Sequence, residues 1–480
     1  MGRVYEIVRR FFSRSTTIIG GIGGQALLTA TRFPVGIFLS TVGTAICIIG
    51  VSRENTDFWN ASLPFILAIA VMIPAAVSFR IFCEERGLKK RLYLTGSVIV
   101  LVLAAGYAFY LRKYFPERRS IESIRAAALF IASVSSILCA PFFRGKRDLA
   151  ASYAVEIGLR FVLSSVFAGV LYGGIAIAFV IIQALLGISF SWKIYLSVNI
   201  LIFGFFLPLH FFAGIPLRKN DSAKLYYPRP LVILITLIML PLIGFYLAII
   251  YIYFAKAIIT LSWPEGTAAY LILTFSIVGI FLLFGVSPIE RDGKGWIARY
   301  TRYFYRTLIP LLPCLYVAIG KRVYDYGITE RRYFVILLAL WLTGMTLYWI
   351  VSRKRAHIII PFSICICAFL SVFGPWDAFN VSRMSQLSRV EGYLRTFHIL
   401  RNDGTISKNK GTVSGDVATQ ISDGISYLQE VHGAKSLTFL PENIRSADVN
   451  KIMKDGLGIT SAESVAVNTY YTYMVNMPKD

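Results

Sequence analysis

The chain has 480 residues, of which 56% are hydrophobic and only 16% are charged, and its mean hydropathy is +0.64. Soluble globular domains carry about 25% charged residues, so this composition excludes an ordinary soluble protein. The formal net charge is +23. Residues 1–376 hold 38 basic and 15 acidic residues, whereas residues 377–480 hold 11 of each, so the whole excess belongs to the apolar part of the chain.

This basic excess does not indicate nucleic-acid binding, which requires a basic patch on a soluble surface. It is typical of a membrane protein, because cytoplasmic loops retain Lys and Arg and anionic lipid headgroups attract them. The sequence therefore predicts the lipid bilayer and its anionic lipid headgroups as partners, and no nucleic acid.

A basic segment, residues 1–33, precedes every long apolar run. Its apolar residues recur at helical spacing opposite four arginines, which predicts an amphipathic helix at the membrane surface, either a simple anchor or a regulatory sensor. Glycines between positions 20 and 24 suggest a flexible joint. We expect no cleaved signal peptide, because the first long apolar run begins only at Pro34. The apolar residues of this helix are Val4, Ile7, Val8, Phe11 and Phe12.

Eleven apolar runs follow, most of them close to the roughly 20 residues that a membrane-spanning helix needs. They predict an all-α polytopic membrane helix bundle over residues 34–376. One run, Thr307–Gly320, is short for a span. The runs are Pro34–Val51, Leu63–Phe79, Leu92–Leu111, Ala126–Phe143, Phe161–Phe190, Ile194–Leu217, Leu231–Ile259, Ala268–Val286, Thr307–Gly320, Tyr333–Ser352 and Ile358–Trp376.

The basic residues are unevenly distributed between alternate gaps. With eleven spans, the gaps on the N-terminal side carry 26 Lys or Arg and the opposite gaps 12, which places the N-terminus in the cytoplasm and the C-terminal tail outside. If Thr307–Gly320 does not span, the tail returns to the cytoplasm. Eleven spans are favoured because Arg306 and Lys321 could snorkel to opposite interfaces.

The tail, residues 377–480, contains no continuous apolar run and is predicted to form a small extramembrane α/β domain. We expect a docking or regulatory role for it, with an envelope protein as its partner. Its predicted elements are helices at Phe379–Leu400, Asp416–Val431 and Ala447–Lys454 and a strand at Ser464–Met474.

Several short motifs resemble a bacterial multi-pass membrane protein family called "domain of unknown function 4153". They are Arg32-Phe33-Pro34, Tyr326-Gly327-Ile328-Thr329 with Arg332-Tyr333, Leu338 to Trp341, and Gly374-Pro375-Trp376 with Ser382, Ser385 and Gln386. The resemblance implies a many-helix protein of the bacterial cytoplasmic (inner) membrane. The family has no settled activity, so no catalytic residue follows from it.

Polar residues inside the spans are few. His210, on the same predicted helix as Asn199, could relay protons, or its imidazole could hydrogen-bond a neighbouring helix near Pro208. Gln183 has the same two interpretations. Ion-coupled carriers usually need a carboxylate near the midplane, and none is found there. The prolines in spans could mark discontinuous helices or ordinary kinks; they are Pro74, Pro208, Pro241, Pro310 and Pro313.

Two gaps on the translocated side are unexpectedly basic, and their residues are candidates for binding phosphate or lipid headgroups. The alternatives are snorkelling or a locally different topology. In the second gap Gly327 suits a tight turn and Thr329 an N-cap, but Arg331 and Arg332 would oppose the dipole of the helix that follows. The candidates are Arg112, Lys113, Arg118, Arg119 and Arg125 in the first gap, and Lys321, Arg322, Arg331 and Arg332 in the second.

The chain contains no P-loop, HExxH, GxSxG or paired-Cys zinc motif, so we expect no metal, no cofactor and no catalytic residues. Its six cysteines are interpreted as packing residues. The leading hypothesis is a non-catalytic bacterial envelope protein that acts as a scaffold or sensor. A permease or lipid-handling transporter, and a membrane-embedded transferase acting on phosphate-bearing lipids, remain alternatives.

Overall fold

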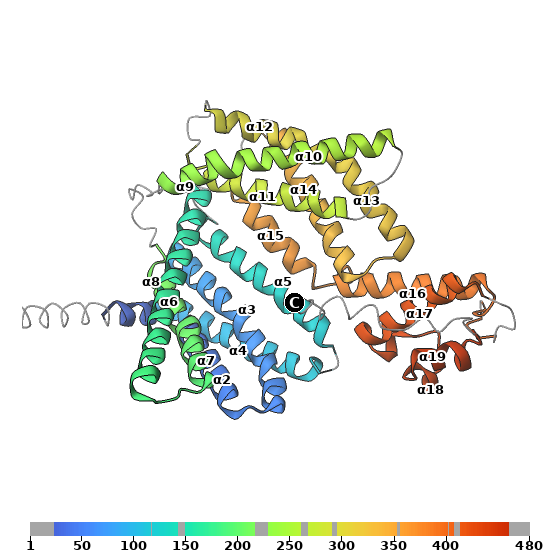
Figure 1. Cartoon of the computed structure of the whole chain (residues 1–480), viewed down its shortest axis with the longest axis horizontal. Coiled ribbons are helices and arrows are strands. Elements are labelled where there is room, and N and C mark those ends of the chain that lie inside the picture. The colour runs from blue at the N-terminus through green and yellow to red at the C-terminus, as the bar shows by residue number, and fades with distance from the viewer. Residues whose placement is uncertain are drawn as a thin grey trace, which may run out of the picture. The chain divides into compact units, whose positions relative to one another are not determined.

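The computed structural model describes residues 24–116, 118–142, 149–216, 229–260, 267–289, 295–352, 356–401, 403–407 and 413–459. The expected N-terminal amphipathic helix and the expected strand at 464–474 lie outside these ranges. The chain divides into two units, of which unit 1 comprises residues 1–321 and 334–374 and unit 2 comprises residues 322–333 and 375–480. Figure 1 labels the elements of both.

Unit 1 begins with four long helices joined by short connections. Asn55 caps α3 by accepting a hydrogen bond from Asp57 N–H (2.7 Å), and Gly87 ends it with φ +60°. α3 contacts α2, α4 and α5, and these helices lie side by side in Figure 1. The helices are α2 (Pro34–Arg53), α3 (Thr56–Arg86), α4 (Lys90–Tyr114) and α5 (Arg119–Cys139), with a 3-10 turn η1 (Ala140–Phe142) after α5.

The next helices contain two π turns, each of which ends two residues before a proline. Leu207 N–H bonds Ile202 O and Leu240 N–H bonds Ile235 O, five residues back, just before Pro208 and Pro241, which have no N–H to donate. Pro74, by contrast, lies inside the unbroken α3. The elements are α6 (Ala150–Leu186), α7 (Trp192–Leu201), η3 (Ile202–Phe206), α8 (Leu207–Ala213), α9 (Arg229–Ile233), η4 (Leu234–Met239) and α10 (Leu240–Ile259).

The last helices of unit 1 are α11 (Thr267–Val286), α12 (Trp296–Leu308), α13 (Leu311–Tyr326), α14 (Glu330–Val351) and α15 (Ile359–Leu370). α12 and α13 are separated at Ile309 and Pro310. α13 and α14 each cross from one unit into the other, because the unit boundaries fall after Lys321 and after Tyr333.

Ten helices in the described ranges are long and apolar enough to span a membrane, rather than the eleven expected. The difference lies in the last run, Ile358–Trp376, whose helix α15 has only 12 residues and is about 18 Å long. The run suspected of being short, 307–320, belongs instead to a 31-residue candidate span, Trp296–Tyr326, made of α12 and α13. The sequence pointed to the wrong run as the short one, because apolar residues can be counted in the sequence but the residue at which α15 ends cannot be read from that count.

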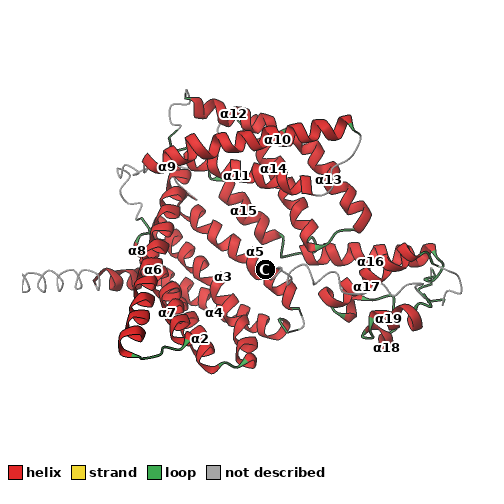
Figure 2. Ribbon diagram, viewed as in Figure 1, coloured by secondary structure: helices red, strands yellow, loops and turns green. Residues whose placement is uncertain are grey.

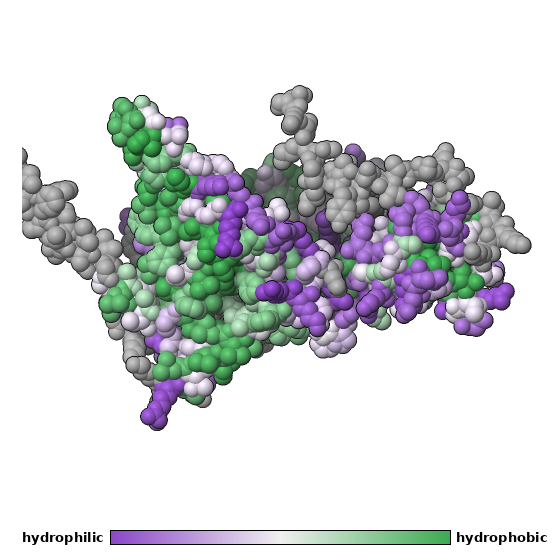
Figure 3. Space-filling view, turned by 90° about the horizontal axis from the view of Figure 1, so that it is seen from below, coloured by the Kyte–Doolittle hydropathy of each residue, from purple (hydrophilic) through white to green (hydrophobic). Residues whose placement is uncertain are grey.

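The helices of unit 1 expose large apolar side chains, such as Leu185 (78% exposed) and Ile252 (70%). Figure 3 shows this hydrophobic surface in green over the helices of unit 1. Exposed apolar area on this scale is unfavourable in water and suits contact with lipid chains. The chain is therefore a polytopic, helical membrane protein.

Unit 2 contains α16 (Ala378–Thr396), α17 (Gly415–His432), a 3-10 turn η5 (Ala434–Ser436), α18 (Glu442–Arg445), α19 (Val449–Lys451) and a π turn η6 (Ile452–Gly456). Asp377 caps α16 by accepting a hydrogen bond from Asn380 N–H (2.6 Å). The unit has its own apolar core, formed by buried side chains that include Leu394, Ile421, Ile425 and Leu428.

The predicted α/β character of the tail is not supported, because its described part is helical (Figure 2). Among the described residues of the tail, the β pairing is one isolated antiparallel bridge between Leu400 and Ile406. A lone bridge of this kind buries too little surface to make a sheet, and the helices supply the core instead.

Candidate functional site

In unit 2 the short connection between α13 and α14 is held by α16. Gln386 Nε2 donates to Tyr326 O (3.0 Å) and to Ile328 O (3.2 Å). The Ile328 N–H donates to Ser385 Oγ (2.9 Å). These bonds satisfy backbone groups that a tight connection leaves without helical partners. The backbone of residues 326–328 is thus bound by two side chains from one face of α16.

Glu330, the first residue of α14, is the centre of a buried polar cluster and is only 6% exposed. Its Oε1 accepts a hydrogen bond from Ser382 Oγ (2.7 Å) and lies 3.2 Å from His432 Nε2, and its Oε2 accepts one from the Tyr427 hydroxyl. Burial, and then the Glu330 carboxylate, raise the pKa of the Tyr427 phenol, which therefore keeps its proton and remains a donor.

We call this arrangement the loop clamp. It consists of the backbone of residues 326–328 and the Glu330 side chain, held by Ser382, Ser385 and Gln386 of α16 and by Tyr427 and His432 of α17. The carboxylate also lies at the N-terminus of α14, where the helix dipole favours negative charge. The clamp joins the first turn of the apolar helix α14 to the helices α16 and α17 of unit 2.

Gly327 is required in the clamp for two reasons. Its φ is +68°, a conformation that costs an L-residue roughly 1–2 kcal/mol. A Cβ at this position would also lie 2.8 Å from Gln386 Nε2. The tight turn expected from the sequence is therefore also a point of close approach to α16.

Replacing Gly327 with Ala should destabilise unit 2 by about 2 kcal/mol, because the strained backbone and the displaced Gln386 add to each other. The control is Gly392→Ala in the middle of α16, where a Cβ meets nothing within 4 Å and should stabilise by roughly 0.5–1 kcal/mol. Thermal unfolding of the purified chain should therefore shift in opposite directions for the two variants. A Gly327→Ala protein as stable as Gly392→Ala would contradict this account.

The second basic gap lies in and beside the clamp. Arg332 Nη1 donates to Tyr326 O (3.0 Å) and Gly327 O (2.8 Å), so this arginine caps the C-terminal end of α13, where a cation is favoured. This contact explains why Arg332 is tolerated near the N-terminus of α14, where a cation opposes the helix dipole. The side chains of Lys321, Arg322 and Arg331 are exposed, without a carboxylate partner in the described ranges, and remain candidates for headgroup binding.

In the first basic gap four cations lie over aromatic rings. Arg112 is 6.0 Å from the Phe65 ring centre, Lys113 and Arg118 are 5.3 and 5.8 Å from Tyr114, and Arg119 is 5.9 Å from Phe115. Such contacts stabilise a cation at an aromatic belt without any bound anion. Headgroup binding by these residues remains a hypothesis.

The fifth cation of that gap, Arg125, is bound to the carboxylate of Glu122, which was not among the residues singled out from the sequence. Its Nη1 donates to Glu122 Oε1 (2.8 Å) and to the Tyr110 hydroxyl (2.7 Å), and Glu122 is fully buried. Oε2 of Glu122 and the Tyr107 hydroxyl have no hydrogen-bond partner among the described residues. The only signal in the sequence was the i, i+3 spacing of Glu122 and Arg125.

A second ion cluster in unit 1 involves the Arg32-Phe33-Pro34 motif. Arg32 binds Glu84 through Nε (3.1 Å) and Nη2 (2.9 Å), and its Nη1 donates to Ile215 O (2.6 Å). Arg80 Nε also donates to Glu84 (2.9 Å), and its guanidinium lies 4.1 Å from the centre of the Tyr93 ring. Glu84 of α3 thus binds Arg32, which precedes α2, and Arg32 in turn binds the backbone of Ile215, which follows α8.

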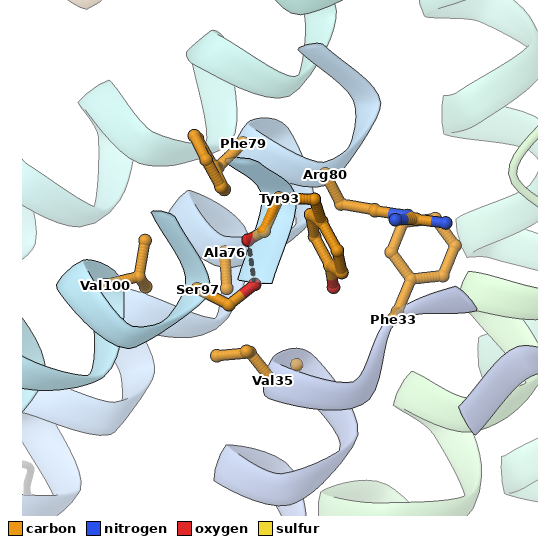
Figure 4. Close-up of a pocket in the computed structure, with 9 residues that line it drawn as sticks. Phe33, Val35, Ala76, Phe79, Arg80, Tyr93, Ser97 and Val100 are labelled. Atoms are coloured by element: carbon orange, nitrogen blue, oxygen red, sulfur yellow. Dashed lines mark hydrogen bonds between the residues drawn. The ribbon is translucent and has the colours of Figure 1, made fainter. Parts of the chain in front are cut away.

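Figure 4 shows the hollow beside this cluster, where Arg80 extends from α3 next to Tyr93 of α4. The hollow is lined mainly by apolar side chains such as Val35, Ala76 and Val100, and it has no room for a water molecule. The Ser97 hydroxyl beside it donates to its own helix, at Tyr93 O (2.9 Å). We interpret this place as packing around an ion pair rather than as a ligand site.

His210 makes a hydrogen bond between helices. Its Nδ1 lies 2.8 Å from Ser164 Oγ of α6, and the rings of Phe167 and Phe206 flank the imidazole at 5.1 and 5.9 Å. Asn199 is half-buried in α7, and Gln183 is exposed near the end of α6. Among the described residues no hydrogen bond joins the three, so the geometry favours helix packing over a relay.

Comparison with known proteins gives one family. The family described as "Domain of unknown function (DUF4153)" matches residues 38–401, more than half of the chain. The chain belongs to this family. The match includes Ser382, Ser385 and Gln386 of the loop clamp and ends before α17, which carries Tyr427 and His432.

The uncharacterized protein PM1469 of Pasteurella multocida (strain Pm70) is a relative of this DUF4153 protein. It is 25% identical over 323 residues, which are 67% of this chain. The chain covers 54% of that relative, about half its length. No solved structure matches.

Proposed function

We propose that this DUF4153 protein is a non-catalytic scaffold or sensor of the bacterial inner membrane. In this proposal unit 2 reads an envelope partner or condition, and the loop clamp transmits its state to α14. The observation that carries the proposal is the clamp itself, because Glu330 begins an apolar helix and is bound by two extramembrane helices. In this proposal the buried carboxylate is released from its partners in a second arrangement, and the envelope partner shifts the balance between the two.

The clamp also supports a proposal for the side on which the tail lies. Tyr333 donates its hydroxyl to Trp376 O (2.9 Å), so the start of the tail lies beside the first turn of α14. From Tyr333 to Val351, α14 extends about 27 Å. The segment between Val351 and Trp376 returns over that distance although α15 is short. We therefore place the tail and the 327–329 connection on the same side.

With a cytoplasmic N-terminus, the eleven crossings counted in this way put that side outside the cytoplasm. The ten long helices make ten of the crossings and the segment with α15 makes the eleventh. The partner in this proposal is accordingly an extracytoplasmic envelope protein.

One observation favours a second candidate function, a permease or lipid-handling transporter. The π turns before Pro208 and Pro241 interrupt two apolar helices in the same way, and interrupted helices surround the substrate sites of many transporters. His210 lies one turn beyond the first interruption. Its hydrogen bond to Ser164 suits packing, which makes this the weaker proposal.

Complementation of a deletion strain separates the two functions. The full chain with Ser382→Ala and Gln386→Ala should insert at normal levels and lose at least about tenfold of the complementing activity, because three of the hydrogen bonds that hold the clamp are removed. Met384→Ala, on an exposed position of the same helix, is the matched control and should complement fully. His210→Ala should also complement.

The permease proposal predicts the reverse pattern. In that pattern His210→Ala loses complementation and the double clamp variant keeps full activity. This result would support a function within the spans and would contradict the scaffold proposal. The abundance of each variant in the membrane fraction shows that a loss is not a folding defect.

A further inference from the structure

The described part of unit 1 contains a polar pocket between α12 and α14, with a volume of ≈ 170 Å³. Its lining residues are Thr301, Arg302, Tyr305, Arg306, Trp349 and Ile350. A cavity needs only about 10–15 Å³ of such volume to hold one water molecule, so this pocket has room for a polar group of several heavy atoms. It is separate from the loop clamp and from the two basic gaps described above.

Two guanidinium groups form one side of the pocket. Arg302 and Arg306 are four residues apart on α12, so their side chains lie on the same face, and both residues are exposed. Like charges at this spacing destabilise a helix by about 0.2–0.5 kcal/mol per pair. Within the described ranges neither guanidinium has a carboxylate partner or a hydrogen bond to a helix carbonyl. Among the residues that the structure describes, nothing therefore compensates this pair of charges.

The other side of the pocket is rigid and aromatic. Tyr305 stacks on Trp349 with ring centres 5.2 Å apart and an interplanar angle of 10°, and both residues are at least 95% buried. α12 is fixed to its neighbours further along, because the Tyr300 hydroxyl donates to Leu240 O (2.7 Å) and the Phe304 ring lies against Gly279 of α11. These contacts fix the rotation of α12 about its axis, so both arginines stay beside the pocket.

The pocket lies at the C-terminal end of an apolar helix that is long enough to span a membrane. Trp349 and Ile350 are in the last turn of α14, an apolar helix of 22 residues that ends at Val351. Arginines and tryptophans gather at this depth, which is the depth of lipid phosphates. α12 has its apolar residues packed inward and its arginines outward, as expected of a helix at that boundary.

We propose that Arg302 and Arg306 bind a phosphate group in this pocket. Guanidinium groups make paired hydrogen bonds to phosphate oxygens, and a phosphate between the two would remove their mutual repulsion. The phosphate belongs either to an anionic lipid headgroup or to a soluble phosphate compound. The site gives the protein a ligand that neither the loop clamp nor His210 could hold, since neither offers an unpaired cation.

The test uses the full chain in nanodiscs and compares Arg302→Gln with Arg306→Gln against Arg299→Gln. Arg299 is exposed on the same helix but does not line the pocket, so it controls for the loss of charge. The lipid arm measures phosphatidylglycerol retained by the protein, by native mass spectrometry after exchange into mixed phosphatidylglycerol and phosphatidylcholine. The soluble arm titrates inorganic phosphate in phosphatidylcholine alone and follows tryptophan fluorescence, to which Trp349 contributes.

The double variant should bind at least about tenfold more weakly than the wild type, whereas Arg299→Gln should bind within about twofold of it. A difference in the lipid arm alone identifies a headgroup, and a difference in the soluble arm identifies a free phosphate compound. If the double variant and Arg299→Gln behave alike in both arms, the proposal is overturned. Thermal unfolding of each variant confirms that the fold persists, as expected for exposed arginines.

Discussion

Glu330→Ala should open the connection between α13 and α14, with a cost of about 3 kcal/mol. The substitution leaves the Ser382 and Tyr427 hydroxyls without their acceptor and removes the carboxylate beside His432. A hydrogen bond to a charged group contributes about 1.5–3 kcal/mol, and a buried donor left without a partner costs about 1–3 kcal/mol. Hydrogen exchange at residues 326–333 should therefore become roughly 100-fold faster, since every 1.4 kcal/mol is a factor of ten.

The control variants separate the effect of losing the charge from the effect of changing the shape of the side chain. Glu330→Gln preserves one acceptor oxygen and should have an intermediate effect, whereas Glu430→Ala removes an exposed carboxylate from α17 and should have almost none. Exchange elsewhere in unit 2, over the core around Ile421 and Ile425, should change less than exchange at the clamp. Equal exchange rates for Glu330→Ala and Glu430→Ala would falsify the clamp as a structural unit.

Glu84→Ala should destabilise unit 1, because Glu84 is the shared ion-pair partner of two arginines. The variant leaves Arg32 and Arg80 side by side without the carboxylate that binds both. Removing one partner of a fully buried ion pair costs about 3–5 kcal/mol. These side chains are 17–24% exposed, so we expect a smaller cost, about 2–3 kcal/mol, and a lower midpoint in thermal unfolding of the detergent-solubilised chain.

The neighbouring Glu85 provides a matched control. It has the same charge, is exposed and has no ion-pair partner in the described ranges, so Glu85→Ala should leave the midpoint within about a degree. Arg32→Lys tests the geometry, because lysine cannot bind Glu84 through two nitrogens. Midpoints for Glu84→Ala and Glu85→Ala that agree would show that the cluster contributes nothing.

The spans were predictable because each is a local property of about 20 consecutive residues. α2, α10 and α14 lie where their apolar runs predicted them. The end of α15 was missed because apolar residues such as Val372, Phe373 and Trp376 continue after Leu370 although the helix has ended. The expected strand at 464–474 lies outside the described residues, and the core of unit 2 is made by helices instead.

The clamp could be only half predicted. Gly327 pointed to a turn and Thr329 to a helix start, since both are local signals. The partners of the Glu330 side chain, Ser382 and Tyr427, are 52 and 97 residues away from it along the chain, and no periodicity connects them. The contacts of Arg332 were not predictable for the same reason, because its partners are the carbonyls at and just after the end of the preceding helix.

By itself the sequence determined that this is a helical membrane protein, where most spans lie, and that its excess positive charge belongs to the membrane part. These properties follow from composition and from patterns that a single helix imposes on its own residues. Only the tertiary structure decided which polar residues meet. It brought Glu330 to α16 and α17, brought the Tyr110 hydroxyl of α4 to Arg125 of α5, and placed Arg302 and Arg306 at a pocket where no carboxylate of the described residues pairs with them. Such contacts depend on the packing of distant helices, which no local pattern records.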